Sequence, residues 1–158
     1  MTNYERIFGT GPRGTLISLL LLAVCMFFEN KIPQLNIMES DTLRYSIFGM
    51  LSVVALFVII WSIKSLPLSD RGASLVTNGA FKYFRHPLYG AFLTFFNIGL
   101  AVLLNHWIYI IWAIALHPLW HWNIKSEEKL METAFPNEYI QYCKVTGRFV
   151  PRLFNNKK

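Results

Sequence analysis

The chain has 158 residues, of which 54% are hydrophobic and only 15% are charged. In soluble domains about a quarter of the residues are charged, so this composition argues against a soluble enzyme and favours a membrane protein. The length suits a single domain over residues 1–158, and the net charge of +6 suits anionic lipid or an acidic ligand.

Four apolar stretches follow one another along the chain. They cover residues 14–28, 45–63, 88–104 and 106–122, and a helix of about 20 residues crosses a bilayer core. Only Asn105 separates the last two stretches, so we expect them to form a tight antiparallel hairpin. The sequence therefore predicts an all-α integral membrane protein with four transmembrane helices.

The positions of Lys and Arg predict the orientation in the membrane. Of the 15 such residues, 13 lie before the first stretch, around the connection between the second and third, or in the C-terminal tail. Lys31 and Arg44 alone lie between the first and second stretches. Because cytoplasmic loops are enriched in these residues, we expect both termini in the cytoplasm.

The tail, residues 124–158, is too polar to form another span. We expect it to form a cytoplasmic helix capped by Ser126, and Pro136 ends that helix. A second short helix is expected over residues 137–145. The tail and the loop at residues 67–86 would then lie at one membrane face, where a water-soluble ligand can meet a lipid-dissolved one.

The segment Arg85-His86-Pro87 begins the third stretch and has two interpretations. In the structural one, proline starts the helix, and arginine and histidine suit the lipid headgroup region. In the functional one, His86 and the free amides of the helix start hold an anionic or polar ligand. The local sequence leaves both open.

The adjacent carboxylates Glu127 and Glu128 are similarly ambiguous. Acidic residues at a helix start are favourable there because of the helix dipole. Beside a membrane they are also suited to a cationic group such as an ammonium.

His117 and His121 are four residues apart, so a regular helix would place them on one face, where a haem or metal could use both. Pro118 lies between them and distorts that turn. Trp120 and Trp122 indicate a membrane interface, where histidine is tolerated. Two ligands are also fewer than a zinc site needs.

Several other classes of site lack a sequence motif. The chain has no Gly-rich phosphate loop, no nucleophile motif and no HExxH segment. It also lacks a soluble module with a basic face, so we expect no nucleic-acid partner.

Together the motifs resemble the isoprenylcysteine carboxyl methyltransferase and phospholipid methyltransferase family. The resemblance covers residues 74–151, with a glycine, an Arg-His-Pro-x-Tyr segment, a helical hairpin, a Glu-Glu-x-x-Leu segment and a tyrosine-rich tail. The matching residues are Gly79, Arg85 to Tyr89, Glu127 to Leu130, Phe135, Tyr139, Tyr142, Arg148 and Pro151.

The resemblance implies a membrane enzyme that uses S-adenosylmethionine without a Rossmann fold and takes a lipophilic acceptor from the bilayer. Glu127 would hold the amino group of the cofactor. By position, the cofactor-binding residues would be Ser74, Leu75, Val76, Phe81, His86, Pro87, Leu88, Tyr89 and Glu127.

The acceptor is less well defined. The prenylcysteine enzymes carry an arginine where this chain has Asn123, and Lys125 or Arg148 would have to take its place near a substrate carboxylate. By this resemblance the expected substrate-binding residues are Asn123 and Arg148. A carboxylate acceptor needs no base, whereas a thiol or amine would need one, with His86 or Glu128 as candidates. The alternatives are a phospholipid amine or small hydrophobic thiol or amine as acceptor, a haem- or metal-binding membrane protein, and a lipid-binding interaction protein.

Overall fold

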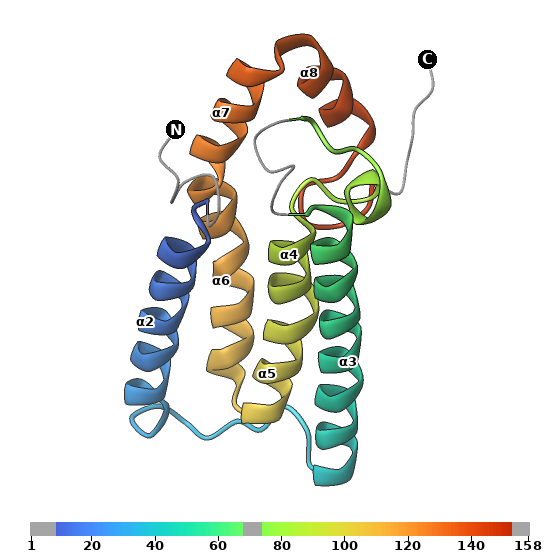
Figure 1. Ribbon diagram of the computed structural model, residues 1–158. Coiled ribbons are helices and arrows are strands. Elements are labelled where there is room, and N and C mark those ends of the chain that lie inside the picture. The colour runs from blue at the N-terminus through green and yellow to red at the C-terminus, as the bar shows by residue number, and fades with distance from the viewer. Residues whose placement is uncertain (1–8, 68–73, 153–158) are drawn as a thin grey trace.

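The helices form a bundle with two further helices at one end (Figure 1). The computed structural model describes residues 9–67 and 74–152, and within them it contains no strand. The helix α2 (Gly11–Glu29) packs on α6 (Trp107–Asn123), and α3 (Asp41–Ser65) packs on the helix that contains α5 (Asn97–Leu104). The predicted all-α architecture is confirmed.

The third apolar stretch forms one helical column of three parts. It begins with α4 (Pro87–Gly90), continues as a π-helix (Ala91–Phe96) and ends with α5. Pro87 occupies the first turn, as expected from its fixed φ and missing N–H.

Three helices are long and apolar enough to cross a membrane: α2, α3 and the column Pro87–Leu104. The fourth, α6, has 17 residues and contains Pro118, so it is about 26 Å long. That is slightly shorter than the hydrocarbon core of about 30 Å. The chain is therefore a multi-pass membrane protein with at least three suitable helices.

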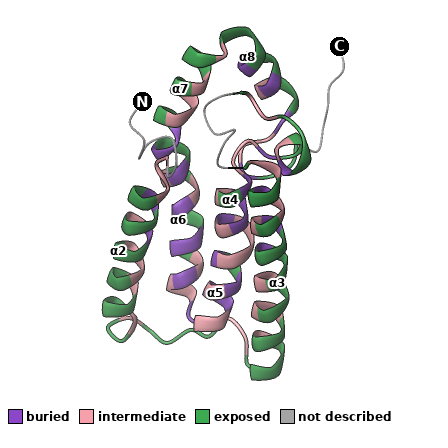
Figure 2. Cartoon of the chain, viewed as in Figure 1, coloured by how far each residue is buried: buried purple, intermediate pink, exposed green. Residues whose placement is uncertain are grey.

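Burial separates the lipid-facing and protein-facing sides (Figure 2). The outer faces of α2 and α3 carry large exposed apolar residues, such as Phe27 and Phe57, which in a bilayer contact lipid. The inner face of α6 carries Trp120, which is almost fully buried. Ser18 on α2 accepts a hydrogen bond from Trp120 Nε1 at 2.9 Å, and its carbonyl accepts one from Trp112 Nε1 at 3.1 Å.

The hairpin predicted between the last two stretches is present. Asn105 has a left-handed conformation with φ 56° and ends α5, and His106 precedes α6. Asn105 Oδ1 accepts hydrogen bonds from Ile37 N at 3.1 Å and Met38 N at 2.9 Å. One residue thus closes the hairpin and attaches the α2–α3 connection to it.

The tail forms the two expected helices, α7 (Lys125–Ala134) and α8 (Pro136–Val145). The prediction that Ser126 caps the first helix is wrong, because α7 begins at Lys125, before that residue, and has no side-chain cap. The chain stays helical through Ile124 as it leaves α6, so no separate start is needed. Cys25 and Cys143 are both free thiols.

We predict that Asn105→Ala destabilises the hairpin more than Asn105→Gly. Both variants lose the two accepted hydrogen bonds, but only alanine strains the left-handed backbone, at a cost of about 1 kcal/mol. Thermal unfolding of the two variants in detergent measures the difference. Equal melting temperatures, or a more stable alanine variant, would show that this conformation is not required.

Candidate functional site

Two distant segments pair beside the start of α4. Arg85 N donates to Gly147 O at 2.8 Å, and His86 N donates to Arg148 O at 3.0 Å. Phe84 and Gly147 form an isolated parallel bridge. These contacts fix the loop that follows α8 against the segment that carries Arg85 and His86.

The Arg85 side chain strengthens the same contact. Its Nη1 donates to the carbonyls of Thr146 at 2.8 Å and Cys143 at 3.2 Å. These carbonyls lie at and just beyond the C-terminal end of α8, where a cation is favourable because of the helix dipole. Arg85 is therefore a structural link in this fold, in addition to any role in binding.

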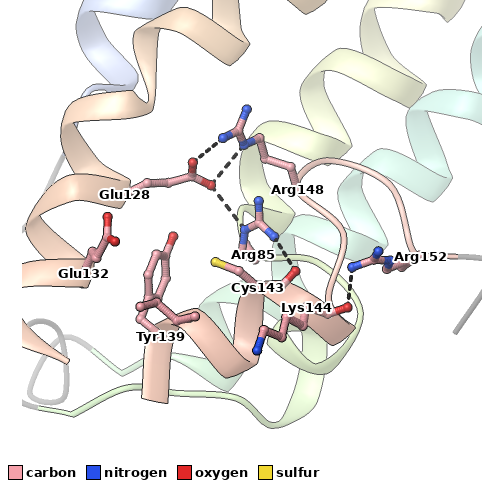
Figure 3. Close-up of a pocket in the computed structure, with 9 residues that line it drawn as sticks. Arg85, Glu128, Glu132, Tyr139, Cys143, Lys144, Arg148 and Arg152 are labelled. Atoms are coloured by element: carbon pink, nitrogen blue, oxygen red, sulfur yellow. Dashed lines mark hydrogen bonds and ion pairs between the residues drawn. The ribbon is translucent and has the colours of Figure 1, made fainter. Parts of the chain in front are cut away.

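Glu128 lies between two arginines (Figure 3). Its Oε1 accepts from Arg85 Nε at 3.2 Å and from Arg148 Nε at 3.0 Å, and its Oε2 pairs with Arg148 Nη2. Burial alone would raise the pKa of Glu128, but His86, Arg148 and Arg85 together lower it to about 2. Glu128 is thus a carboxylate that stays ionised and joins α7 to both paired segments.

His86 lies between the two adjacent carboxylates. Its Nδ1 is 3.5 Å from Glu127 Oε2, and its Nε2 is 3.5 Å from Glu128 Oε1. Its ring stacks on Tyr89, with 5.6 Å between centroids and an angle of 12° between planes. Phe149 packs against the ring at a centroid distance of 6.2 Å.

The two oxygens of Glu127 have different surroundings. Oε1 accepts from Tyr89 OH at 2.9 Å, from Thr10 Oγ1 at 2.7 Å and from the Thr10 backbone N–H. Oε2 faces His86. Three donors meet the lone pairs of Oε1, so Oε2 is the oxygen with capacity for a ligand.

A cavity of about 470 Å³ is lined by Glu128 and Arg85, and His86 itself does not line it. Its volume is in the range of small-molecule sites. It lies between α7, α8 and the segment after α8, and four cations and two carboxylates line it. The charged lining residues are Arg85, Lys144, Arg148, Arg152, Glu128 and Glu132, and Tyr139, Ile140 and Cys143 complete the wall.

The structure brings together some of the predicted cofactor residues and not others. His86, Tyr89 and Glu127 form one contact cluster, and Pro87 is buried beside it. Leu88 is 37% exposed.

None of the nine predicted cofactor residues lines the cavity: this holds for Ser74, Leu75, Val76 and Phe81, and also for the segment His86 to Tyr89 and for Glu127. The carbonyl of Phe81 accepts instead from Tyr142 OH at 2.5 Å. Burial raises the pKa of Tyr142, so this hydroxyl remains a donor.

The two predicted substrate residues have partners within the protein. Asn123 is buried, and its Nδ2 donates to Thr10 O at 3.1 Å. The Arg148 guanidinium contacts Glu128 and, at 2.7 Å through Nη1, His121 Nδ1. Arg148 reaches the cavity, whereas Asn123 does not line it.

The histidine pair of α6 lies apart from any larger set of metal ligands. Because arginine is always a donor, the contact with Arg148 makes His121 Nδ1 an acceptor. Among the described residues, no group of three or more His, Cys, Asp and Glu side chains is placed to hold a metal ion. The described residues thus add no third side-chain ligand to His117 and His121.

A protein-family model, that of the isoprenylcysteine carboxyl methyltransferase (ICMT) family, matches residues 45–133. The match covers more than half of the chain and includes most of α3, the Arg85 to Tyr89 segment, the hairpin and both Glu127 and Glu128. The chain belongs to this family. Comparisons with curated proteins and with solved structures gave no match.

Family membership indicates a membrane methyltransferase, which agrees with the long apolar helices. The match ends at residue 133, so it does not include α8 and the segment that pairs with Arg85 and His86. It also does not include α2 and Thr10.

Sequence reasoning missed Thr10 and the linking role of Arg85. The sequence signal for Thr10 is the glycine-rich segment Gly-Thr-Gly-Pro-Arg-Gly over residues 9–14, which precedes the first apolar stretch. Glycines allow close approach of backbone to other groups. Here a Cβ at Gly11 would lie 3.3 Å from Tyr89 OH, and one at Gly9 would collide with the Glu127 carboxylate.

We predict that Glu128 stabilises the folded protein at neutral pH and that this contribution decreases as the pH falls. The pKa is lowered from 4.5 to about 2 on folding, so the contribution is complete above pH ~4.5 and is lost as pH falls towards 2. A shift of this size corresponds to at most about 3 kcal/mol. Chemical unfolding of the parent and of Glu128→Gln across this pH range measures it.

The control is Glu132→Gln, which removes a carboxylate from the same cavity wall. Glu132 forms no ion pair with the described residues. If the stability difference between the parent and Glu128→Gln did not change with pH, Glu128 would not be an ionised carboxylate that stabilises the fold through Arg85 and Arg148.

Proposed function

We propose that this protein transfers a methyl group from S-adenosylmethionine to a lipophilic acceptor dissolved in the membrane. The observation that carries the proposal is the placement of His86 between Glu127 and Glu128, which joins the two motifs of the family resemblance in one site. These motifs are about 40 residues apart in sequence, one at the start of α4 and the other on α7.

The described residues fit the cofactor at two points. Glu127 Oε2 is a partly buried carboxylate oxygen with no donor closer than His86 at 3.5 Å, and it suits an ammonium group. The cavity of about 470 Å³ is lined by Glu128, the neighbour of Glu127, and has room for a small-molecule ligand, although neither His86 nor Glu127 lines it. Its positive excess suits an anionic group of such a ligand.

Bound S-adenosylmethionine would supply a methyl group on a sulfonium: the acceptor would attack the methyl carbon in line, and the breaking C–S bond would release a neutral thioether. The protein needs to bind, align and exclude water, and alignment alone is worth as much as roughly 7–11 kcal/mol. Tyr89 and Phe149 pack against the His86 ring, and Trp120 packs on Tyr89, so aromatic rings limit the access of water to this side of His86.

The acceptor class determines whether a base takes part. The carboxylate of an isoprenylcysteine-like molecule attacks through its oxygen and releases no proton. A lipid amine or a small hydrophobic thiol loses a proton as the new bond forms. Glu128, with a pKa of about 2, is a weak base at neutral pH, so His86 is the better candidate for that step.

We also propose that α6 is a fourth span and that both termini are cytoplasmic. The hairpin returns α6 along the column Pro87–Leu104, so α6 traverses the same thickness as its neighbour (Figure 1). The distribution of Lys and Arg then places the site at the cytoplasmic face. A soluble cofactor can reach it from there, and a lipid acceptor can approach between the helices.

We predict that Glu127→Gln weakens cofactor binding by tens-fold or more. Removing one partner of a partly buried charged pair costs about 2–5 kcal/mol. Cofactor in excess raises the melting temperature of a protein that binds it, according to RT ln(1 + [L]/Kd). Thermal unfolding with increasing S-adenosylmethionine therefore reports the affinity of the parent and the variant.

The matched control is Glu138→Gln, which makes the same change at an exposed position on α8. Equal cofactor affinity in the parent and Glu127→Gln would leave Glu127 with a structural role only. No stabilisation of the parent by the cofactor would overturn the proposed function.

We predict that a reporter fused after the last residue is active in its cytoplasmic form. The same reporter inserted at Asn36, in the α2–α3 connection, is expected to be active only in its non-cytoplasmic form. The same pattern at both sites would contradict α6 as a fourth span, and the reversed pattern would contradict the cytoplasmic placement of the C-terminus.

A further inference from the structure

The N-terminal segment before α2 reaches the proposed cofactor carboxylate. Thr10 provides two of the three donors to Glu127 Oε1, its backbone N–H and its Oγ1 at 2.7 Å. The two residues are 117 positions apart in the sequence. Thr10 lies outside the region matched by the family model, residues 45–133.

Thr10 is itself held in place. Its carbonyl accepts a hydrogen bond from Asn123 Nδ2 at 3.1 Å and a helical one from Gly14 N at 3.0 Å. A Cβ at Gly14 would lie 2.7 Å from both Asn123 Nδ2 and the Trp120 ring. The start of α2 is therefore seated directly on α6, with no space for a side chain at this glycine.

Gly9 allows the chain to turn over the carboxylate. Its φ of 54° lies in the left-handed region that favours glycine, and a Cβ there would collide with Glu127. The backbone N–H of Thr10 can approach Glu127 Oε1 because residue 9 has no side chain.

The consequence for Glu127 is a fixed orientation. Oε1 is occupied by Thr10 and by Tyr89 OH at 2.9 Å, whereas Oε2 is directed at His86. A carboxylate held at one oxygen loses little rotational freedom when its other oxygen binds a ligand, and such preorganisation increases affinity.

We propose that Thr10 is a positioning residue that orients Glu127 for the amino group of the cofactor. The site is completed by a segment outside the family match, the residues 9–14. This inference rests on the proposed function, because it assumes that Glu127 Oε2 receives an ammonium group.

The experiment is cofactor affinity of the full-length protein in detergent, with S-adenosylmethionine as the ligand and calorimetry as the readout. Thr10→Val keeps the size of the side chain and removes the hydroxyl donor. We expect roughly tenfold weaker binding, which corresponds to about 1.4 kcal/mol. Thr10→Ser keeps the donor and is expected to bind as the parent does.

Two further variants separate positioning from a general structural effect. Thr15→Val makes the same change at an exposed position of α2, and we expect it to leave the affinity unchanged. In a Glu127→Ala background, Thr10→Val is expected to have no further effect, because Thr10 acts only through that carboxylate.

The outcomes are distinct. A parent that binds no cofactor overturns the proposed function and this inference with it. A parent that binds, with Thr10→Val equal to it, overturns the positioning role alone. A tenfold loss from Thr10→Val that persists in the Glu127→Ala background also overturns it, since Thr10 would then act independently of Glu127.

Discussion

The site depends on the pairing of Arg85 and His86 with Gly147 and Arg148. Two backbone hydrogen bonds align the segments, and the Arg85 side chain binds the end of α8. Two glycines make room for this loop, because a Cβ at Gly147 would collide with Val150 O of the loop itself, and a Cβ at Gly90 of α4 would collide with Phe149 O. The same pairing delivers Arg148 to Glu128, so backbone geometry in a short loop determines the electrostatics around the histidine.

The arrangement connects a polar end of the bundle to its apolar body. His86 is the residue before α4, Tyr89 lies on the first turn of that helix, and Glu127 and Glu128 lie on the first turn of α7. Tyr89 in turn packs on Trp120 of α6, at a centroid distance of 4.8 Å. The proposed site for methyl transfer thus lies at the boundary between the apolar helical bundle and its polar end.

Much of the fold could be predicted from the sequence, because apolar runs and helix-breaking residues act locally. Because only Asn105 separates two apolar runs, the sequence predicted a hairpin there, and Pro136 predicted the end of the first tail helix. The cap at Ser126 failed because helix continuity from α6 overrode a local preference. The contact of Thr10 with Glu127 depends on tertiary packing between distant segments, and single-sequence patterns do not report it.

The candidate site was predictable only where family motifs carried the information. His86, Tyr89 and Glu127 contact one another as the motifs implied, but neither they nor Ser74 to Val76 line the cavity. The central claim is that these residues support methyl transfer to a membrane lipid. Incubating the purified protein with methyl-labelled S-adenosylmethionine and a membrane extract tests it most directly. The account predicts label in an organic-extractable product with the parent and almost none with His86→Ala; equal labelling by both, or none by the parent, would contradict it.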